Sequence, residues 1–257
     1  MALTVVKIGG NVIDNSEALD AFVHDFAQLP SPKILVHGGG KLATHLSQRL
    51  GIETHMVNGR RITDRETLDV VTMVYAGLVN KTIVAKLQKE GCNAIGLSGA
   101  DANIIPAVKR PPQPIDYGYV GDIHAEQINA TAIQMLMDAG ITPVFCALTH
   151  DGKGSMLNSN ADSVASAVAV AMSRLMPVDL VFCFELPGVM RNVEDKDSLI
   201  SAIDEDIYRQ LRQEGIVQKG MIPKIDNAFS AIRQGVNQVV IKHSANLNKP
   251  LGTVIKL

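Results

Sequence analysis

The residues best suited to chemistry in this sequence lie in two glycine-rich turns, each of which follows a short apolar stretch. The first turn reads Lys7-Ile8-Gly9-Gly10, and the second reads His37-Gly38-Gly39-Gly40. Glycine lets the backbone approach a ligand closely, and the free amides at the start of a helix favour anions. Glycines also make ordinary tight turns, but two such turns, one with an adjacent lysine, favour binding of a phosphate or a carboxylate.

Three further groups of polar residues point to the same chemistry. Asn158-Ser159-Asn160-Ala161-Asp162 precedes an apolar helical stretch, and helix capping accounts for only one or two of its three polar groups. Arg61 has a planar guanidinium that can hold a carboxylate with two bonds, although arginines on hairpins are commonly just solvated. Lys224 falls in the first turn of a predicted helix, where the helix dipole disfavours a cation, so we expect an anionic partner there.

Other common catalytic groups are missing from the sequence. Cys92, Cys146 and Cys183 lie far apart in apolar runs and are expected to be reduced core thiols, and the histidines show no metal-ligand spacing. His37 ends an apolar stretch, where we expect it to bond to the backbone. The phosphate-loop motif GxxxxGK[ST] is absent, which argues against a Walker-type nucleotide site.

Short β-branched stretches alternate with longer helical patterns, which predicts an α/β fold with a mainly parallel sheet covered on both faces. The C-terminal ends of parallel strands share one edge, so both glycine turns should open into one crevice. The predicted strands are 4–8, 33–37, 94–97, 142–146, 180–184 and 238–241, and the predicted helices are 16–29, 41–50, 64–90, 125–139, 161–175, 204–214 and 221–234. A capping box at 63–66 should open helix 64–90, and 52–63 and 109–122 are predicted edge hairpins.

The composition limits the possible partners and the possible location. The chain has 257 residues, of which 46% are hydrophobic, and a formal net charge of −2. There is no basic excess that would draw it to nucleic acid or to anionic lipid. No signal-peptide pattern or long uninterrupted apolar run stands out, so we expect a cytoplasmic protein that acts on small molecules.

Six segments of the chain resemble, in order, the signature segments of the N-acetylglutamate kinase family, which is one of the amino acid kinases. These segments are 7–10, 37–40, 58–61, 96–101, 158–162 and 220–224. The resemblance spans nearly the whole chain. It implies an open αβα sandwich, with an acylglutamate-binding lobe over about 1–175 and a nucleotide-binding lobe over about 176–257.

The resemblance also implies an activity and a set of site residues. The activity is transfer of the ATP γ-phosphate, with Mg²⁺ bound to the nucleotide, to the side-chain carboxylate of an N-acyl-L-glutamate, an early step of arginine biosynthesis. By position, Lys7 and Lys224 match the lysines that neutralise the phosphoryl group, and Asp162 matches the carboxylate that orients them. The implied substrate contacts are Gly39, Gly40, Arg61, Asn158 and Asn160. The implied nucleotide contacts are Gly9, Gly10, Glu185, Leu186, Pro187, Gly188, Val189, Ile216, Val217 and Gln218.

Several alternatives remain open at this point. Phe184-Glu185-Leu186 stands where the family usually has Thr or Ser, then Asp and Val, and Ala100 replaces a common lysine, so the implied nucleotide contacts depart from the family pattern. The acyl group is either acetyl or a larger group such as succinyl. The activity could instead be that of a carbamate, aspartate or uridylate kinase, or the chain could be a non-catalytic regulator that binds nucleotide or acylglutamate. Retention of Lys7, Asp162 and Lys224 argues against the regulator.

The resemblance carries one expectation about assembly. Arginine-regulated members of the family have an additional N-terminal helix that joins dimers into hexamers, whereas only six residues precede Lys7 here. We therefore expect a homodimer that arginine does not inhibit.

Overall fold

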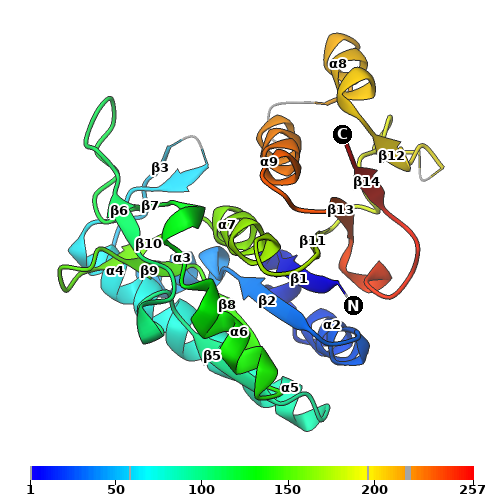
Figure 1. The fold of residues 1–257 in the computed structure, drawn as a ribbon. Coiled ribbons are helices and arrows are strands. Elements are labelled where there is room, and N and C mark those ends of the chain that lie inside the picture. Colours follow the sequence, from blue (N-terminus) through cyan, green and yellow to red (C-terminus); the bar gives the residue numbers. More distant parts are fainter. Residues whose placement is uncertain (1, 58, 196, 218–220) are drawn as a thin grey trace.

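The fold is built on one large β-sheet. The structure is a computed structural model that describes residues 2–57, 59–195, 197–217 and 221–257. Its eight-stranded sheet has the order β12-β14-β13-β11-β1-β2-β8-β5 (Figure 1). The strands are β1 (Leu3–Ile8), β2 (Lys33–His37), β5 (Ala94–Leu97), β8 (Thr142–Cys146), β11 (Val178–Phe184), β12 (Ala202–Ile203), β13 (Gln238–His243) and β14 (Thr253–Ile255). Only the β13–β14 pair within this sheet is antiparallel, which confirms the prediction of a mainly parallel sheet.

Helices cover both faces of the sheet, as expected for an αβα sandwich. On one face, α7 (Ala161–Ser173) contacts β1, β2 and β11, α6 (Ala130–Asp138) covers β8, and α9 (Ile222–Arg233) covers β13. On the other face, α2 (Ser16–Gln28) packs against α5 (Asn80–Lys89), which also contacts β5 and β8 (Figure 1). The remaining helices are α1 (Gly10–Asp14), α3 (Gly40–Arg49), α4 (Arg65–Thr72) and α8 (Glu205–Gln213). The predicted fold class is therefore confirmed.

The central strands are buried on both faces, which is why they read as nearly continuous apolar runs. Every residue of β2 and β8 is buried, as are five of the six residues of β1. Lys7 is one of these buried residues, and it pairs across the sheet with Val36 of β2 and Phe182 of β11. The charge of Lys7 is thereby held at the C-terminal edge of the sheet, next to the first glycine turn.

Three hairpins stand beyond this edge of the sheet. The predicted hairpins are present as β3 (Met56–Val57) with β4 (Arg60–Arg61), and as β6 (Ala107–Lys109) with β7 (Gly121–Ile123). Asn58, which lies between these two strands in the sequence, is outside the described residues. A third hairpin, β9 (Leu148–His150) with β10 (Met156–Asn158), was not predicted. Single bridges between positions 63 and 118 and between 120 and 158 join the three hairpins.

The predicted helix 64–90 is continuous, but its start and its middle differ from the prediction. The helix is capped by Asp64, whose carboxylate accepts the amide of Thr67 at 2.8 Å, so the capping box at Thr63 was wrong. Thr63 is fully buried and turns toward the hairpins instead. Between α4 and α5 the helix widens into a π-helix, Met73–Val79, which a pattern of 3.6-residue periodicity does not reveal.

The same helical run bears on the expectation of no membrane contact. By length and composition alone, Arg65–Lys89 could cross a membrane, and 44% of its most apolar stretch is buried inside the protein. The core helix of a soluble protein passes the same test, so this observation is weak evidence for a membrane span.

The predicted helix 125–139 was too long at its start. Residues Ala125–Gln127 form a 3-10 turn, and α6 begins only after Asn129, whose side chain accepts the amide of Ala132 at 3.1 Å. An asparagine cap of this kind is a common start signal for a helix.

Candidate active site

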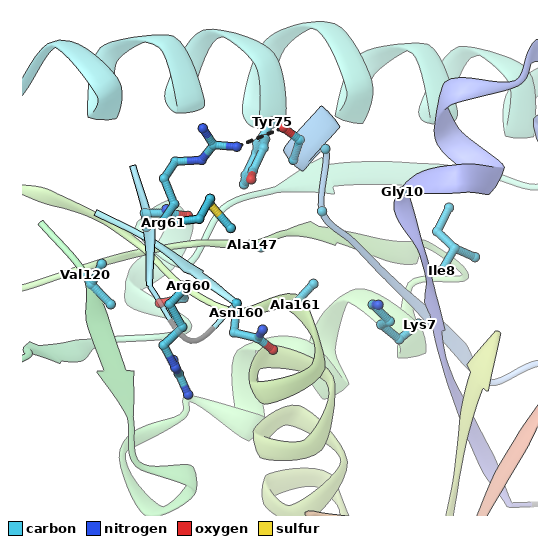
Figure 2. Close-up of a pocket in the computed structure, with 17 residues that line it drawn as sticks. Lys7, Ile8, Gly10, Arg60, Arg61, Tyr75, Val120, Ala147, Asn160 and Ala161 are labelled. Atoms are coloured by element: carbon cyan, nitrogen blue, oxygen red, sulfur yellow. Dashed lines mark hydrogen bonds between the residues drawn. The ribbon is translucent and has the colours of Figure 1, made fainter. Parts of the chain in front are cut away.

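A pocket of about 210 Å³ opens at the C-terminal edge of the sheet, between the two glycine turns and the β3–β4 hairpin (Figure 2). We call it the glycine-turn pocket. The predicted site residues that line it are Lys7, Gly10, Gly39, Gly40, Arg61, Asn158 and Asn160. Gly38, Arg60 and Tyr75 line it as well, although none of them was named as a site residue from the sequence. The fold thus gathers residues of segments 7–10, 37–40, 59–61 and 158–162 around one hollow.

Lys7 and Asp162 form an ion pair at one side of this pocket. The Lys7 ammonium lies 2.7 Å from Oδ1 of Asp162, and the two side chains retain 11% and 18% of their exposure. Asp162 lies in the first turn of α7, where the helix dipole favours a negative charge. The pair therefore holds a positive charge in a fixed place at the edge of the sheet.

His37 supports the second glycine turn through a hydrogen bond to its backbone. The His37 Nδ1 atom bonds to the carbonyl of Gly38 at 2.7 Å, and Nε2 lies 3.0 Å from the amide nitrogen of Asn80, which also donates to the carbonyl of Val144. A ring that donates through Nδ1 and accepts through Nε2 is neutral. Burial lowers the pKa of His37 to about 4, against the opposing influence of its bond to Gly38. The prediction that His37 bonds to the backbone is confirmed.

Arg61 holds the same turn from the hairpin side. Its Nη2 atom donates to the carbonyl of Gly40 at 2.9 Å and to Oγ1 of Thr44 at 2.8 Å, and its Nη1 atom donates to Oγ1 of Thr54 at 3.2 Å. Figure 2 draws the bond to Gly40 as a dashed line. Several donors of Arg61 are therefore engaged with the protein, and its contact with a substrate carboxylate remains a prediction.

Arg60 extends in the opposite direction from Arg61, as alternate residues of a strand do (Figure 2). It is half-buried, and no acidic residue in the described parts of the chain forms an ion pair with it. Burial lowers the pKa of Arg60, the charge of Arg110 lowers it further, and Asp122, which is paired with Arg110, opposes this. Arg60 thus lines the pocket, while its side chain extends away from that of Arg61 (Figure 2). The sequence contained the residue but gave no sign that it would be half-buried.

Tyr75 lines the pocket next to Gly39 of the second glycine turn. A Cβ atom on Gly39 would lie 2.9 Å from Cδ1 of Tyr75, so only glycine fits against the ring. Burial raises the pKa of Tyr75, and the neighbouring charge of Arg61 partly opposes that rise. Tyr75 belongs to the π-helix, and no local signal in the sequence predicted that it would reach the pocket.

The polar residues around the start of α7 have different structural roles. Asn160 is the N-cap of α7, since its side-chain oxygen accepts the amide of Ser163 at 3.1 Å. Asn158 is buried and donates through Nδ2 to Oγ1 of Thr63 at 3.0 Å, which ties β10 to the β3–β4 hairpin. Capping therefore explains one of these groups, while Asn158 and Asp162 serve other contacts.

A second hollow lies on the C-terminal side of the sheet, after β11. A pocket of about 640 Å³ is lined by the predicted nucleotide residues Leu186, Gly188, Val189, Ile216 and Val217, together with Lys224. A smaller pocket of about 180 Å³ beside it is lined by Phe184, Glu185 and Lys224, among others. Gly9 and Pro187 line none of these pockets, the exposed Ala100 does not either, and Gln218 lies outside the described residues.

Lys224 lies beside the same aromatic ring as Lys7. It lies in the first turn of α9, as predicted, and its ammonium lies 3.6 Å from the ring centroid of Phe184. The Lys7 ammonium, which lines the glycine-turn pocket, lies 5.5 Å from the same centroid. The two lysines therefore approach one ring from the two pockets, and a group that passes from one pocket to the other would meet both charges.

Known proteins resemble this chain over nearly its full length. A model of the Amino acid kinase family matches residues 2–243. The acetylglutamate kinase of Cytophaga hutchinsonii is 57% identical over 98% of this chain and 97% of its own length, and that of Phocaeicola vulgatus is 54% identical over 99% and 98%. The crystal structure of smu.665 from Streptococcus mutans UA159 matches with a TM-score of 0.81 at 27% identity, covering 99% of this chain and 98% of that chain.

Proposed function

Because the chain belongs to the amino acid kinase family, we propose that it transfers the γ-phosphate of ATP to the side-chain carboxylate of an N-acyl-L-glutamate. The acyl group is acetyl or succinyl, and the product is an acyl phosphate of arginine biosynthesis. The observation that carries the proposal is the convergence of Lys7 and Lys224 on the space between two pockets. The acetylglutamate kinases among its relatives support the choice of substrate.

The proposed reaction needs positive charge more than it needs a base. The substrate carboxylate is already ionised at neutral pH, so its oxygen attacks the γ-phosphorus directly while the bond from that phosphorus to ADP breaks. Lys7 and Lys224 neutralise the phosphoryl oxygens, and Asp162 fixes Lys7. Backbone amides of Gly10, Gly39 and Gly40 are available to the oxygens that gain charge. This division of labour explains why no catalytic histidine is required, since the buried His37 is neutral and engaged.

The remote end of the substrate is proposed to lie toward the β3–β4 hairpin. Both arginines of the hairpin line the pocket, and Arg61 is proposed to bind the carboxylate that does not react. Asn158 and Asn160 also line the pocket and are proposed to contact the acylamino group. Arg61 also bonds to Gly40 of the second glycine turn. This bond would link binding of the remote carboxylate to the conformation of the turn beside the carboxylate that reacts.

The nucleotide is proposed to occupy the larger hollow after β11. Its apolar wall, which includes Leu186, Val189, Ile216 and Val217, suits a nucleobase, and Lys224 faces the side on which the phosphates would enter. We propose that Mg²⁺ arrives with the nucleotide phosphates, as is usual for such ions. The described residues offer no cluster of three acidic, histidine or cysteine side chains that would hold a resident metal ion.

We further propose two lobes and a homodimer. The residues lining the glycine-turn pocket all precede position 175 and those lining the larger hollow all follow position 176, which supports lobes over about 1–175 and 176–257. Met73 and Leu78 are 54% and 59% exposed on the π-helix and offer apolar surface for a second copy. Light scattering at micromolar concentration tests the dimer, and a monomeric mass would contradict it. A cytoplasmic location completes the proposal.

The experiment that tests the proposed function measures ADP release in a coupled assay. N-acetyl-glutamate, N-succinyl-glutamate, free glutamate, aspartate, carbamate and UMP are offered side by side with MgATP. We expect an N-acylglutamate to give the highest kcat/KM and free glutamate to be a poor substrate. Equal or better turnover of UMP, carbamate or free glutamate would overturn the proposal, and no ADP release with any substrate would favour a non-catalytic regulator.

A further inference from the structure

The ring of Phe184 lies close to both lysines of the site. Phe184 is the last residue of β11, the strand that pairs directly with β1, and so it comes close to the end of β1 that carries Lys7. Its ring stacks on that of Phe182, with centroids 6.2 Å apart and an interplanar angle of 19°. The Lys224 ammonium lies 3.6 Å and the Lys7 ammonium 5.5 Å from the centroid of the Phe184 ring.

The arrangement of charges leaves Lys224 in need of a partner. Asp162 forms its ion pair with Lys7, and no carboxylate of the described residues forms one with Lys224. Burial lowers the pKa of Lys224, and repulsion from Lys7 lowers it further, while Asp162 and Glu185 act in the opposite direction. A lysine in this position would tend to lose its proton or swing into solvent unless something stabilised the ammonium.

The face of an aromatic ring is such a stabiliser. The ring quadrupole attracts a cation centred over it within about 6 Å, most strongly when the cation is partly desolvated. At 3.6 Å the Lys224 ammonium makes close contact with the face of Phe184. The fold itself does not demand an aromatic residue here, because Phe184 is only half-buried at the end of its strand and faces the small pocket.

We propose that Phe184 is a positioning residue that keeps the charged ammonium of Lys224 beside Lys7 when no phosphate is bound. The inference rests on the proposed function, because the use of a positioned Lys224 is phosphoryl transfer. A contact with the ring suits this task because it is weaker than a charge-assisted hydrogen bond to phosphate. The incoming phosphoryl oxygens can therefore replace the ring as the partner of the ammonium. An acidic partner at the same place would compete with the phosphate instead.

Three variants separate the ring face from simple packing. Phe184→Leu keeps an apolar side chain but removes the ring, and Phe184→Tyr keeps the ring. Phe182→Leu is the matched control, because it removes a ring two residues earlier on the same strand, where no lysine lies over it among the described residues. If Phe184→Leu does not fold by circular dichroism, Phe184→Met takes its place.

Two measurements on these variants test the proposal. The first is steady-state kinetics, in which Phe184→Leu should lower kcat about 5- to 30-fold with little change in the acylglutamate KM, the size of a partly desolvated cation–ring contact. The second is the pKa of Lys224 itself, obtained without substrate from the pH dependence of its competitive labelling by acetic anhydride and mass spectrometry. Because the ring favours the protonated form, that pKa should fall in Phe184→Leu. Phe184→Tyr and Phe182→Leu should leave it near the wild-type value.

The outcomes of the two measurements are distinguishable. A Lys224 pKa that is the same with Phe, Leu and Tyr at position 184 overturns the inference, whatever the enzyme does. A normal kcat in Phe184→Leu also overturns it, because the proposed function would then stand without the ring. If the pKa falls as expected but the wild-type protein does not phosphorylate any N-acylglutamate, the contact is real and the proposed function is wrong.

Discussion

Replacing Lys7 by methionine isolates the contribution of one charge to the proposed reaction. Methionine keeps an unbranched side chain of similar length at the end of β1 but removes the ammonium. If that ammonium meets the phosphoryl group mainly as charge moves in the transition state, kcat should fall by roughly 10²–10³, as for one preorganised electrostatic donor. The KM values should change much less, because the contact is weaker in the ground state.

The same substitution has a cost in stability that the structure lets us estimate. Breaking the ion pair leaves the Asp162 carboxylate, whose side chain is only 18% exposed, without its partner at 2.7 Å. Removing one partner of a buried pair costs about 3–5 kcal/mol, and the residual exposure of both side chains favours the lower end, about 3 kcal/mol. The double variant Lys7→Met with Asp162→Asn should regain part of this free energy of unfolding. It should not regain kcat, because the positive charge is still missing.

Lys33→Met provides the matched control. Lys33 is another buried lysine of the same sheet, but it begins β2 at the opposite edge and donates to the carbonyls of Ala27 and Leu29 at 2.7 and 2.8 Å. Its replacement should lower the free energy of unfolding and leave kcat near the wild-type value. The assays are coupled ADP release and urea unfolding on all four proteins. A folded Lys7→Met variant with near-normal kcat would refute the proposed role of Lys7.

Three further predictions concern other parts of the site. Arg61→Ala should raise the acylglutamate KM about 30- to 150-fold, the equivalent of ~2–3 kcal/mol for a charge-assisted bidentate pair, and lower kcat less; steady-state kinetics showing the reverse order would contradict this. His37→Gln should flatten the pH dependence of stability. The wild-type ring has a pKa of about 4 in the folded state against 6.5 in the unfolded state, so the free energy of unfolding of the wild-type protein falls by about 2 kcal/mol between pH 7 and pH 5 as the unfolded state takes up the proton. Equal slopes for both proteins in urea unfolding would refute the burial of a neutral ring. Gly39→Ala should lower the free energy of unfolding by about 1–3 kcal/mol and raise the substrate KM, because its Cβ would lie 2.9 Å from Tyr75. In urea unfolding, Gly40→Ala should keep the stability of the wild type, because its Cβ would have its nearest contact at 3.8 Å, and an equal loss in both variants would contradict this reasoning.

The sequence by itself determined the fold class and most of the central strands. Alternating β-branched and helical stretches predicted strands 33–37, 94–97 and 142–146 with the bounds that the structure shows. Signals of this kind are local: a parallel strand buried on both faces is apolar throughout, and a helix start carries its own cap. For the same reason the sequence placed Lys7 at a strand end and Lys224 in the first turn of a helix, because each position depends only on neighbouring residues.

What the sequence did not contain was which distant residues would meet. The β9–β10 hairpin, which delivers Asn158, was missed because its strands have only three residues each. The π-helix brings Tyr75 under Gly39 through a widening of the helix that leaves no periodic signature. The bonds of Arg61 to Gly40 and Thr44 depend on how the hairpin folds over α3.

The shared ring of Phe184 shows the physical reason most directly. Lys7, Phe184 and Lys224 are far apart in the chain, and they meet only because β11 is placed next to β1 in the sheet and α9 packs beside α7. That order is decided by the burial of whole helix and sheet faces against one another, a sum over many contacts that no short segment encodes. The sequence therefore predicted which residues could take part in the chemistry, whereas the arrangement of the charged residues relative to one another was decided only by tertiary packing.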